Sequence, residues 1–101
     1  MENTAAERTR QTLNMLDNSA LPWQTKAKAV FNLHCYLAEQ NVKEYPGGRM
    51  WSTYKTADAL NISRERVNED VRLCIYMRDF GTFFKGYTKK RALAHLRSEG
   101  K

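Results

Sequence analysis

The chain has only two cysteines among its 101 residues, too few for the disulfide framework that stabilises many small secreted proteins. Cys35 and Cys74 each lie within an apolar helical pattern, and neither has a neighbouring cysteine at the spacing of a metal-binding pair. We therefore expect two buried thiols in a reducing compartment and no metal site.

Long hydrophobic runs are also missing. No stretch approaches the roughly 20 apolar residues that cross a bilayer. The start, Met1-Glu2-Asn3-Thr4, has neither the basic residues nor the apolar stretch of a secretory signal. Hydrophobic residues make up 42% and charged residues 28% of the chain, values typical of a soluble globular domain. These features predict a cytoplasmic protein that does not contact a membrane.

The sequence motifs of common enzymes are absent as well. There is no glycine-rich phosphate loop, no His-Glu-x-x-His and no interpretable Ser/His/Asp set, and the chain has two histidines. His34 lies on an apolar helix face, where a core histidine with satisfied hydrogen bonds is commoner than a ligand. We expect His95 at the surface. The sequence therefore predicts that the chain is not an enzyme, has no catalytic residue and holds no cofactor.

Alternation of apolar and polar residues is absent, whereas apolar residues recur at spacings of three or four. This pattern predicts an all-α fold, a compact bundle of about five helices in one domain covering residues 1–101. A short hairpin around Pro46-Gly47-Gly48 remains an alternative for that segment. The expected parts are an N-terminal arm or helix (1–19), a core helix (20–40), a Pro-Gly-Gly loop (41–50), a helix-turn-helix (51–79), and an aromatic linker with a basic C-terminal helix (80–101).

Positive charge is concentrated near the C-terminus. The chain has a formal net charge of +6, and residues 51–101 hold 11 lysines and arginines against six acids. Residues 85–101 hold six basic residues against Glu99 alone. A polyanionic partner would explain this excess, although such a charge also aids solubility.

Residues 53–72 predict a short helix, a tight turn and a second helix. Ala57 is small enough to let two helices approach closely, and Leu60 packs beneath it. Asn61 occupies the turn position that requires a left-handed backbone, which asparagine tolerates better than most residues. Ser63 can accept a hydrogen bond from a free amide at the start of the second helix. Apolar residues that would then face inward are Ile62, Val67, Val71, Cys74 and Ile75.

This segment resembles the helix-turn-helix of phage and plasmid DNA-binding proteins. Lys55-Thr56-Ala57, Leu60, Ile62, Val67-Asn68 and Val71 are similar to the pattern of small phage repressors. The stretch from Thr56 to Leu73 also looks like the corresponding region of ParB-type partition proteins, in several of which a basic helix follows, as residues 88–93 do here. The resemblance covers residues 51–98 and departs from the pattern in having Asn61 where glycine is usual.

The resemblance implies that the second helix enters the major groove of double-stranded DNA in a bacterial or phage-infected cell. Arg64 would pair with guanine, Asn68 with adenine or a phosphate, and Glu65 with cytosine. The base contacts implied are Ser63, Arg64, Glu65, Asn68 and Glu69. The phosphate contacts implied are Lys55, Thr56, Arg66, Arg72, Lys85, Lys89, Lys90 and Arg91. The expected function is that of a sequence-specific transcriptional regulator or a phage or plasmid accessory factor.

Acidic residues on the second helix leave a second interpretation open. Glu65, Glu69 and Asp70 accompany the arginines there, as on an ordinary solvated helix face, and would weaken purely electrostatic binding to DNA. The alternative function is a small protein-interaction module that binds or inhibits a protein partner. We also expect a homodimer, formed through the apolar face of residues 23–38 and the N-terminal arm.

The segment from residue 80 to residue 87 is rich in aromatic residues. Phe80, Phe83, Phe84 and Tyr87 are expected to hold the final helix, capped by Thr88, against the core. The alternative is that these rings stack on the bases of a nucleic acid.

Overall fold

The described residues of the computed structural model, 5–48 and 50–100, form five helices and no strand. The all-α prediction is confirmed. Residues 1–4 of the expected arm, residue 49 of the expected loop and residue 101 of the expected final helix lie outside the described part. The helices are α1 (Ala5–Asp17), α2 (Trp23–Glu44), α3 (Thr53–Leu60), α4 (Arg64–Phe80) and α5 (Lys89–Ser98). No helix in the described ranges is long and apolar enough to cross a membrane.

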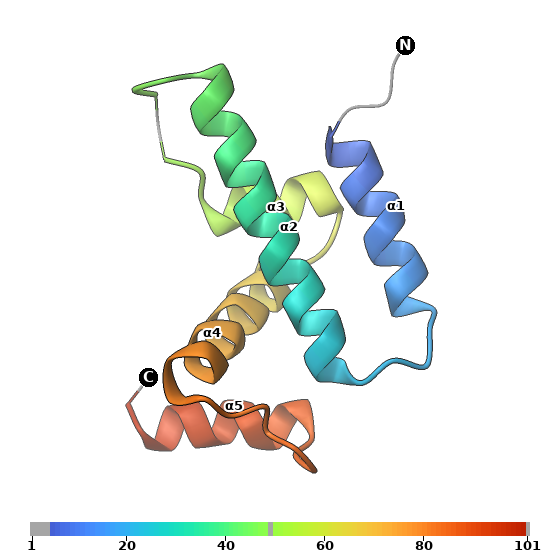
Figure 1. The fold of residues 1–101 in the computed structure, drawn as a ribbon, viewed down its shortest axis with the longest axis vertical. Helices are drawn as coiled ribbons and strands as arrows, with labels where there is room; N and C mark the ends of the chain where they lie inside the picture. Colours follow the sequence, from blue (N-terminus) through green and yellow to red (C-terminus); the bar gives the residue numbers. More distant parts are fainter. Residues whose placement is uncertain (1–4, 49, 101) are drawn as a thin grey trace.

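The long helix α2 runs through the middle of the molecule (Figure 1). It contacts α1, α3 and α4, and α5 contacts α4. Pro22 is the N-cap of α2, one position before the first helical turn in which the sequence suggested it. The helix continues to Glu44 rather than ending at residue 40. An exposed Lys43–Glu39 ion pair of 3.5 Å supports the extra turn. The helix ends before Pro46, which has no amide hydrogen to donate.

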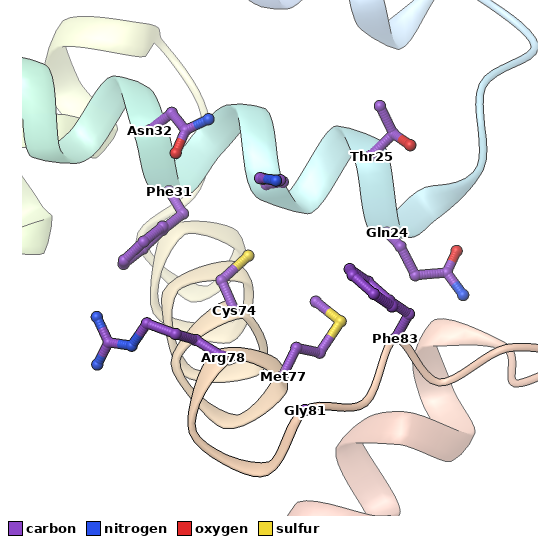
Figure 2. Close-up of a pocket in the computed structure, with 10 residues that line it drawn as sticks. Gln24, Thr25, Phe31, Asn32, Cys74, Met77, Arg78, Gly81 and Phe83 are labelled. Atoms are coloured by element: carbon purple, nitrogen blue, oxygen red, sulfur yellow. The ribbon is translucent and has the colours of Figure 1, made fainter.

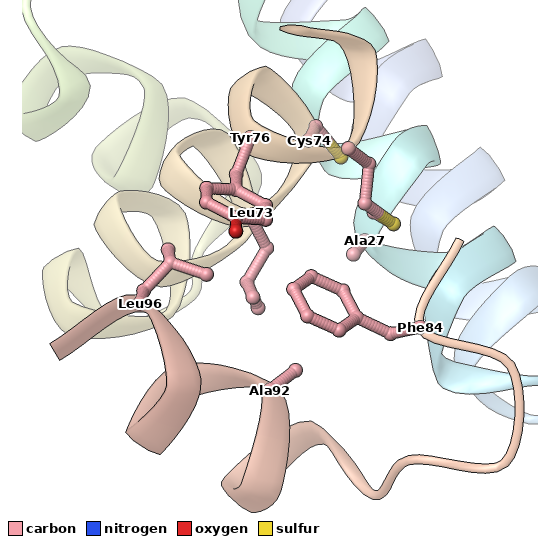
Figure 3. Packing of buried hydrophobic residues seen from close by; sticks show 8 residues of the cluster. Ala27, Leu73, Cys74, Tyr76, Phe84, Ala92 and Leu96 are labelled. Atoms are coloured by element: carbon pink, nitrogen blue, oxygen red, sulfur yellow. The ribbon is translucent and has the colours of Figure 1, made fainter. Parts of the chain in front are cut away.

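The hydrophobic core has two parts that share α2 and α4. The first joins α1, α2, α3 and α4, and its buried residues are Leu13, Val30, Ala57, Leu60 and Val67. The second joins α2, α4, α5 and the segment between α4 and α5, and its buried residues are Ala27, Leu73, Cys74, Tyr76, Met77, Phe84, Ala92 and Leu96 (Figure 3). Both α2 and α4 therefore contribute apolar side chains to both parts of the core. For this reason these two helices make the most extensive contact with each other.

The apolar face of α2 is used inside the chain. Ala27, Val30 and Leu37 are buried against neighbouring helices, and α1 packs on both α2 and α3. Part of the α2 face that we expected to form a homodimer is thus covered within the chain, because α1, α3 and α4 pack on it. The homodimer itself stays a prediction.

Two of the four rings in the aromatic segment, residues 80–87, pack into the core, as we expected for rings that hold the final helix in place. Phe84 is buried and Tyr87 is half-buried, and Figure 3 shows the Phe84 ring pointing into the space between α2, α4 and α5. Trp23 Nε1 donates a hydrogen bond of 2.7 Å to the carbonyl oxygen of Tyr87, which ties the segment to α2. Phe80 and Phe83 are exposed, although the Phe80 ring stacks on that of Tyr76 with their centroids 4.4 Å apart.

Three further sequence predictions are wrong. Cys35 is exposed, because it lies at the edge of the buried stripe of α2, whereas Cys74 is buried as expected. Ile75 is exposed. The buried face of α4 contains Leu73 and Met77, and Ile75 points to a different side of the helix. His95 is half-buried, with its Nε2 atom 3.0 Å from the Tyr76 hydroxyl.

Candidate nucleic-acid interface

The α3–α4 unit is held together by local capping. The Ser52 side chain accepts a hydrogen bond of 3.3 Å from the Lys55 amide at the start of α3. Asn61 ends α3 in the left-handed conformation (φ 57°), as the sequence predicted. The Ser63 side chain then accepts a bond of 3.1 Å from the Arg66 amide. These caps set the position at which α4 begins.

One side of α4 is presented to solvent at its N-terminal end. Arg64, Glu65 and Asn68 are exposed, and Arg72 is exposed one turn further along. Residues 64, 68 and 72 follow the four-residue spacing of a single helix face. The opposite side of α4 is buried through Val67 and Asp70. Most of the predicted base-contacting residues are thus brought together on one surface, which Ser63 extends at the exposed cap position.

Two of the predicted DNA-contacting cations, Arg64 and Lys55, lie against aromatic rings of α3 and of the segment before it. The Arg64 guanidinium lies 4.1 Å from the centroid of the Tyr54 ring, and Lys55 Nζ lies 5.7 Å from that of Trp51. A ring face attracts a cation and limits the motion of a long side chain. Sequence reasoning did not identify Tyr54, because no local pattern places a residue of α3 against one of α4.

A network of ion pairs occupies two of the predicted phosphate contacts. Arg66 donates two hydrogen bonds to the Asp17 carboxylate, of 2.7 and 2.8 Å, and a third of 3.4 Å to Asp70. Lys89 Nζ lies 2.7 Å from Asp70 Oδ1 and 3.9 Å from Glu69 Oε1. The hydrogen bonds from Arg66 hold the pKa of Asp17 below its usual value. Arg66 and Lys89 therefore link the end of α1 and the start of α5 to α4.

The same network explains the acidic residues of α4. Asp70 is only 1% exposed, and a buried carboxylate requires nearby cations to offset its desolvation. Glu69 is partly buried beside Lys89. Of the three carboxylates that argued against DNA, Glu65 is the one that the structure leaves exposed.

Thr56 lies in the core rather than at the surface. It has no exposed area, and its Oγ1 accepts a hydrogen bond of 2.6 Å from Trp51 Nε1, which can only donate. His34 Nδ1 lies 2.6 Å from the same Thr56 oxygen; a neutral imidazole with its hydrogen on Nε2 accepts the Thr56 hydroxyl hydrogen at this distance. Burial lowers the pKa of His34 and favours that neutral form. His34 is thus half-buried and has a hydrogen-bond partner on Nδ1, whereas the burial of Thr56 removes it from any phosphate-binding surface.

The remaining predicted phosphate contacts lie near the start of α5. Lys90 and Arg91 are exposed in its first turn, and Lys85 is exposed in the preceding segment. The Thr88 side chain caps the helix by accepting a bond of 3.1 Å from the Arg91 amide, as expected. The Arg91 guanidinium lies 4.6 Å from the centroid of the Tyr87 ring. Because Lys89 reaches Asp70, this basic turn lies beside the middle of α4.

Among residues 5–48 and 50–100, no group of three or more histidine, cysteine, aspartate or glutamate side chains is arranged to hold a metal ion. Comparison of the chain with family models, curated proteins and solved structures gives no match.

Proposed function

We propose that the chain binds double-stranded DNA, with the exposed side of α4 in the major groove. The base contacts are Ser63, Arg64, Glu65 and Asn68, with Glu69 at the edge of the surface. The phosphate contacts are Lys55, Arg72, Lys85, Lys90 and Arg91. Arg66 and Lys89 have a structural role instead, since their charges are engaged by Asp17 and Asp70.

The observation that carries the proposal is the separation of charge on α4. Asp70 is turned into the core and Glu69 is half-buried. Arg64, Asn68 and Arg72 are presented outward, together with the exposed carboxylate of Glu65. An exposed helix face with arginine and asparagine near its N-terminus matches the donors and acceptors of base edges. The basic turn of α5 supplies further attraction for the phosphate backbone.

The proposal is tested by selecting binding sites from fragmented genomic and randomised duplexes. The selected duplex is then titrated by fluorescence anisotropy at about 50 and 200 mM salt. We expect one enriched sequence motif and an affinity that falls steeply as salt rises. Absence of an enriched motif, with only weak binding to every duplex, would contradict the proposal.

Variants separate base contacts from phosphate contacts. Arg64→Ala and Asn68→Ala should change the preferred base at one position, at a cost of about 1–3 kcal/mol for the native site. Lys90→Ala should weaken all duplexes equally and reduce the salt slope by about one. Arg97→Ala is the matched control, because Arg97 is exposed at the far end of α5, and it should leave the preferred sequence unchanged.

A specific surface feature favours binding to a protein as the second candidate. Large apolar side chains are exposed on the C-terminal half of α2, in the segment before α3 and in the first turn of α3, namely Tyr36, Val42, Tyr45, Met50 and Tyr54. Under this alternative, several of them form the apolar patch that a protein partner covers. Under this alternative, Tyr45→Ser would abolish capture of a protein partner, whereas Arg64→Ala and changes in salt would have little effect on it.

A further inference from the structure

An open groove of about 660 Å³ lies between α2 and the C-terminal half of α4. Its volume is within the range of roughly 300–1,000 Å³ typical of small-molecule sites. Figure 2 shows Phe31 extending from α2 toward α4, and Phe83 extending toward α2 from the segment after α4. The groove is formed by residues other than those of the proposed DNA-binding surface, and the inference does not depend on that proposal.

The walls of the groove are mainly apolar. Phe31, Cys74, Met77 and Phe83 contribute to them. Burial raises the pKa of the Cys74 thiol to about 11, so this wall carries no charge at neutral pH. Phe83 is 72% exposed although it lines the groove, which means that an apolar molecule in the groove would cover a ring that water now surrounds.

The charged residues that line the groove in the described part of the chain are basic. Lys28 and Arg78 line it, and none of its described lining residues is acidic. Lys28 is exposed. Arg78 already forms an exposed ion pair with Asp79 through a 3.1 Å hydrogen bond from its Nε–H, and its guanidinium has further N–H groups that a second carboxylate can accept from. Two cations beside an apolar wall are complementary to a molecule with an apolar body and one anionic group.

We propose that this groove binds a small apolar carboxylic acid, such as a medium-chain aliphatic acid. The apolar body of the ligand covers Phe83 and Met77, and its carboxylate pairs with Lys28 and Arg78. The ligand thus bridges α2, α4 and the segment that follows α4.

Methionine methyl signals provide a direct test. The chain has four methionines; Met77 lines the groove, whereas Met15 and Met50 are exposed outside it. Decanoate and decanol are each titrated below their aggregation limits, and the methyl spectrum is followed by NMR. We expect decanoate to shift the Met77 signal selectively and to bind about tenfold more tightly than decanol, because only decanoate pairs with the cations.

Variants assign the two parts of the site. Lys28→Met combined with Arg78→Met should reduce decanoate affinity to that of decanol, whereas Phe83→Ala should weaken both ligands several-fold. Arg97→Met and Phe80→Ala are matched controls outside the groove lining and should have no effect. Equal affinity of the native chain for the two ligands would overturn the proposal. Absence of binding, or shifts confined to Met15 or Met50, would overturn it too.

Discussion

Asp70 shows how a single charged residue is accommodated in the core. Its carboxylate lies between Lys89 of α5 and Arg66 of α4, and Arg66 in turn holds Asp17 of α1. Removal of one member of a buried ion-pair network leaves the others desolvated without compensation. The pairs also fix three helices relative to one another, which gives this carboxylate a structural role.

We expect Asp70→Asn, which preserves shape and removes the charge, to lower the free energy of unfolding by about 1–3 kcal/mol. Asp79→Asn is the matched control on the same helix, because the Asp79–Arg78 pair is solvent-exposed and should contribute less than about 0.5 kcal/mol. Urea unfolding at neutral pH measures both variants. Equal effects of the two substitutions would show that the network adds no more than a surface ion pair.

His34 should make stability depend on pH. Burial lowers its pKa in the folded chain below the ordinary value of 6.5, so the unfolded chain binds a proton first as pH falls. The free energy of unfolding should therefore be fully retained above pH 6.5 and decrease as pH falls below it. The contribution of Asp17 is lost only below its ordinary value of 3.8, outside this window.

The measurement compares urea unfolding of the native chain and His34→Gln at about pH 7.5 and pH 5. Glutamine retains a side chain that can hydrogen-bond to Thr56 but does not titrate. The native chain should lose more stability than the variant between the two pH values. An identical loss in both proteins would remove His34 as the cause.

At the scale of elements, the turn between α3 and α4 depends on one backbone conformation. Asn61 has φ 57° and ψ 46°, and the Ile62 amide donates to the Ala57 carbonyl oxygen across the turn. A β-branched side chain is strained in this region, whereas glycine is not. The geometry of the turn therefore depends on a residue that tolerates a left-handed backbone.

Asn61→Val should lower the free energy of unfolding by about 1–2 kcal/mol, whereas Asn61→Gly should match or slightly exceed the native chain. Thermal and urea unfolding monitored by circular dichroism distinguish the two variants. If Asn61→Val were as stable as Asn61→Gly, the left-handed conformation could not be the constraint at this position.

At the scale of the whole molecule, Phe84 connects α5 to the rest of the chain. It is 4% exposed and packs against rings from three other parts of the chain, Trp23, Tyr76 and His95. The Gln24 side chain donates a hydrogen bond of 3.1 Å to its carbonyl oxygen. The second part of the core is thus assembled around this ring.

Phe84→Ala should cost about 3–5 kcal/mol of stability, and hydrogen exchange of the α5 amides should accelerate more than that of α1. Phe83→Ala is the adjacent control, since Phe83 is mostly exposed, and should cost less than about 0.5 kcal/mol. Similar losses in the two variants would mean that α5 is held by contacts other than this ring.

Most of the fold could be predicted from the sequence because its signals are local. Helical spacing, the caps at Ser63 and Thr88, and the left-handed Asn61 depend on residues within about four positions of one another. The end of α2 was misplaced because no residue before Pro46 stops a helix. The exposed Cys35 and Ile75 lie at stripe edges, where periodicity alone does not separate core from surface.

The candidate site was predicted only in part. The sequence alone identifies Ser63 as the cap before α4 and places Arg64, Glu65 and Asn68 near the start of that helix. Only the tertiary structure decided which charges remain outward. Arg66 meets Asp17 across 49 positions, and Lys89 reaches Asp70 from a different helix. Such pairs form when packing brings distant helices together, because burial makes a partner necessary and sequence spacing carries no information about which residue it will be.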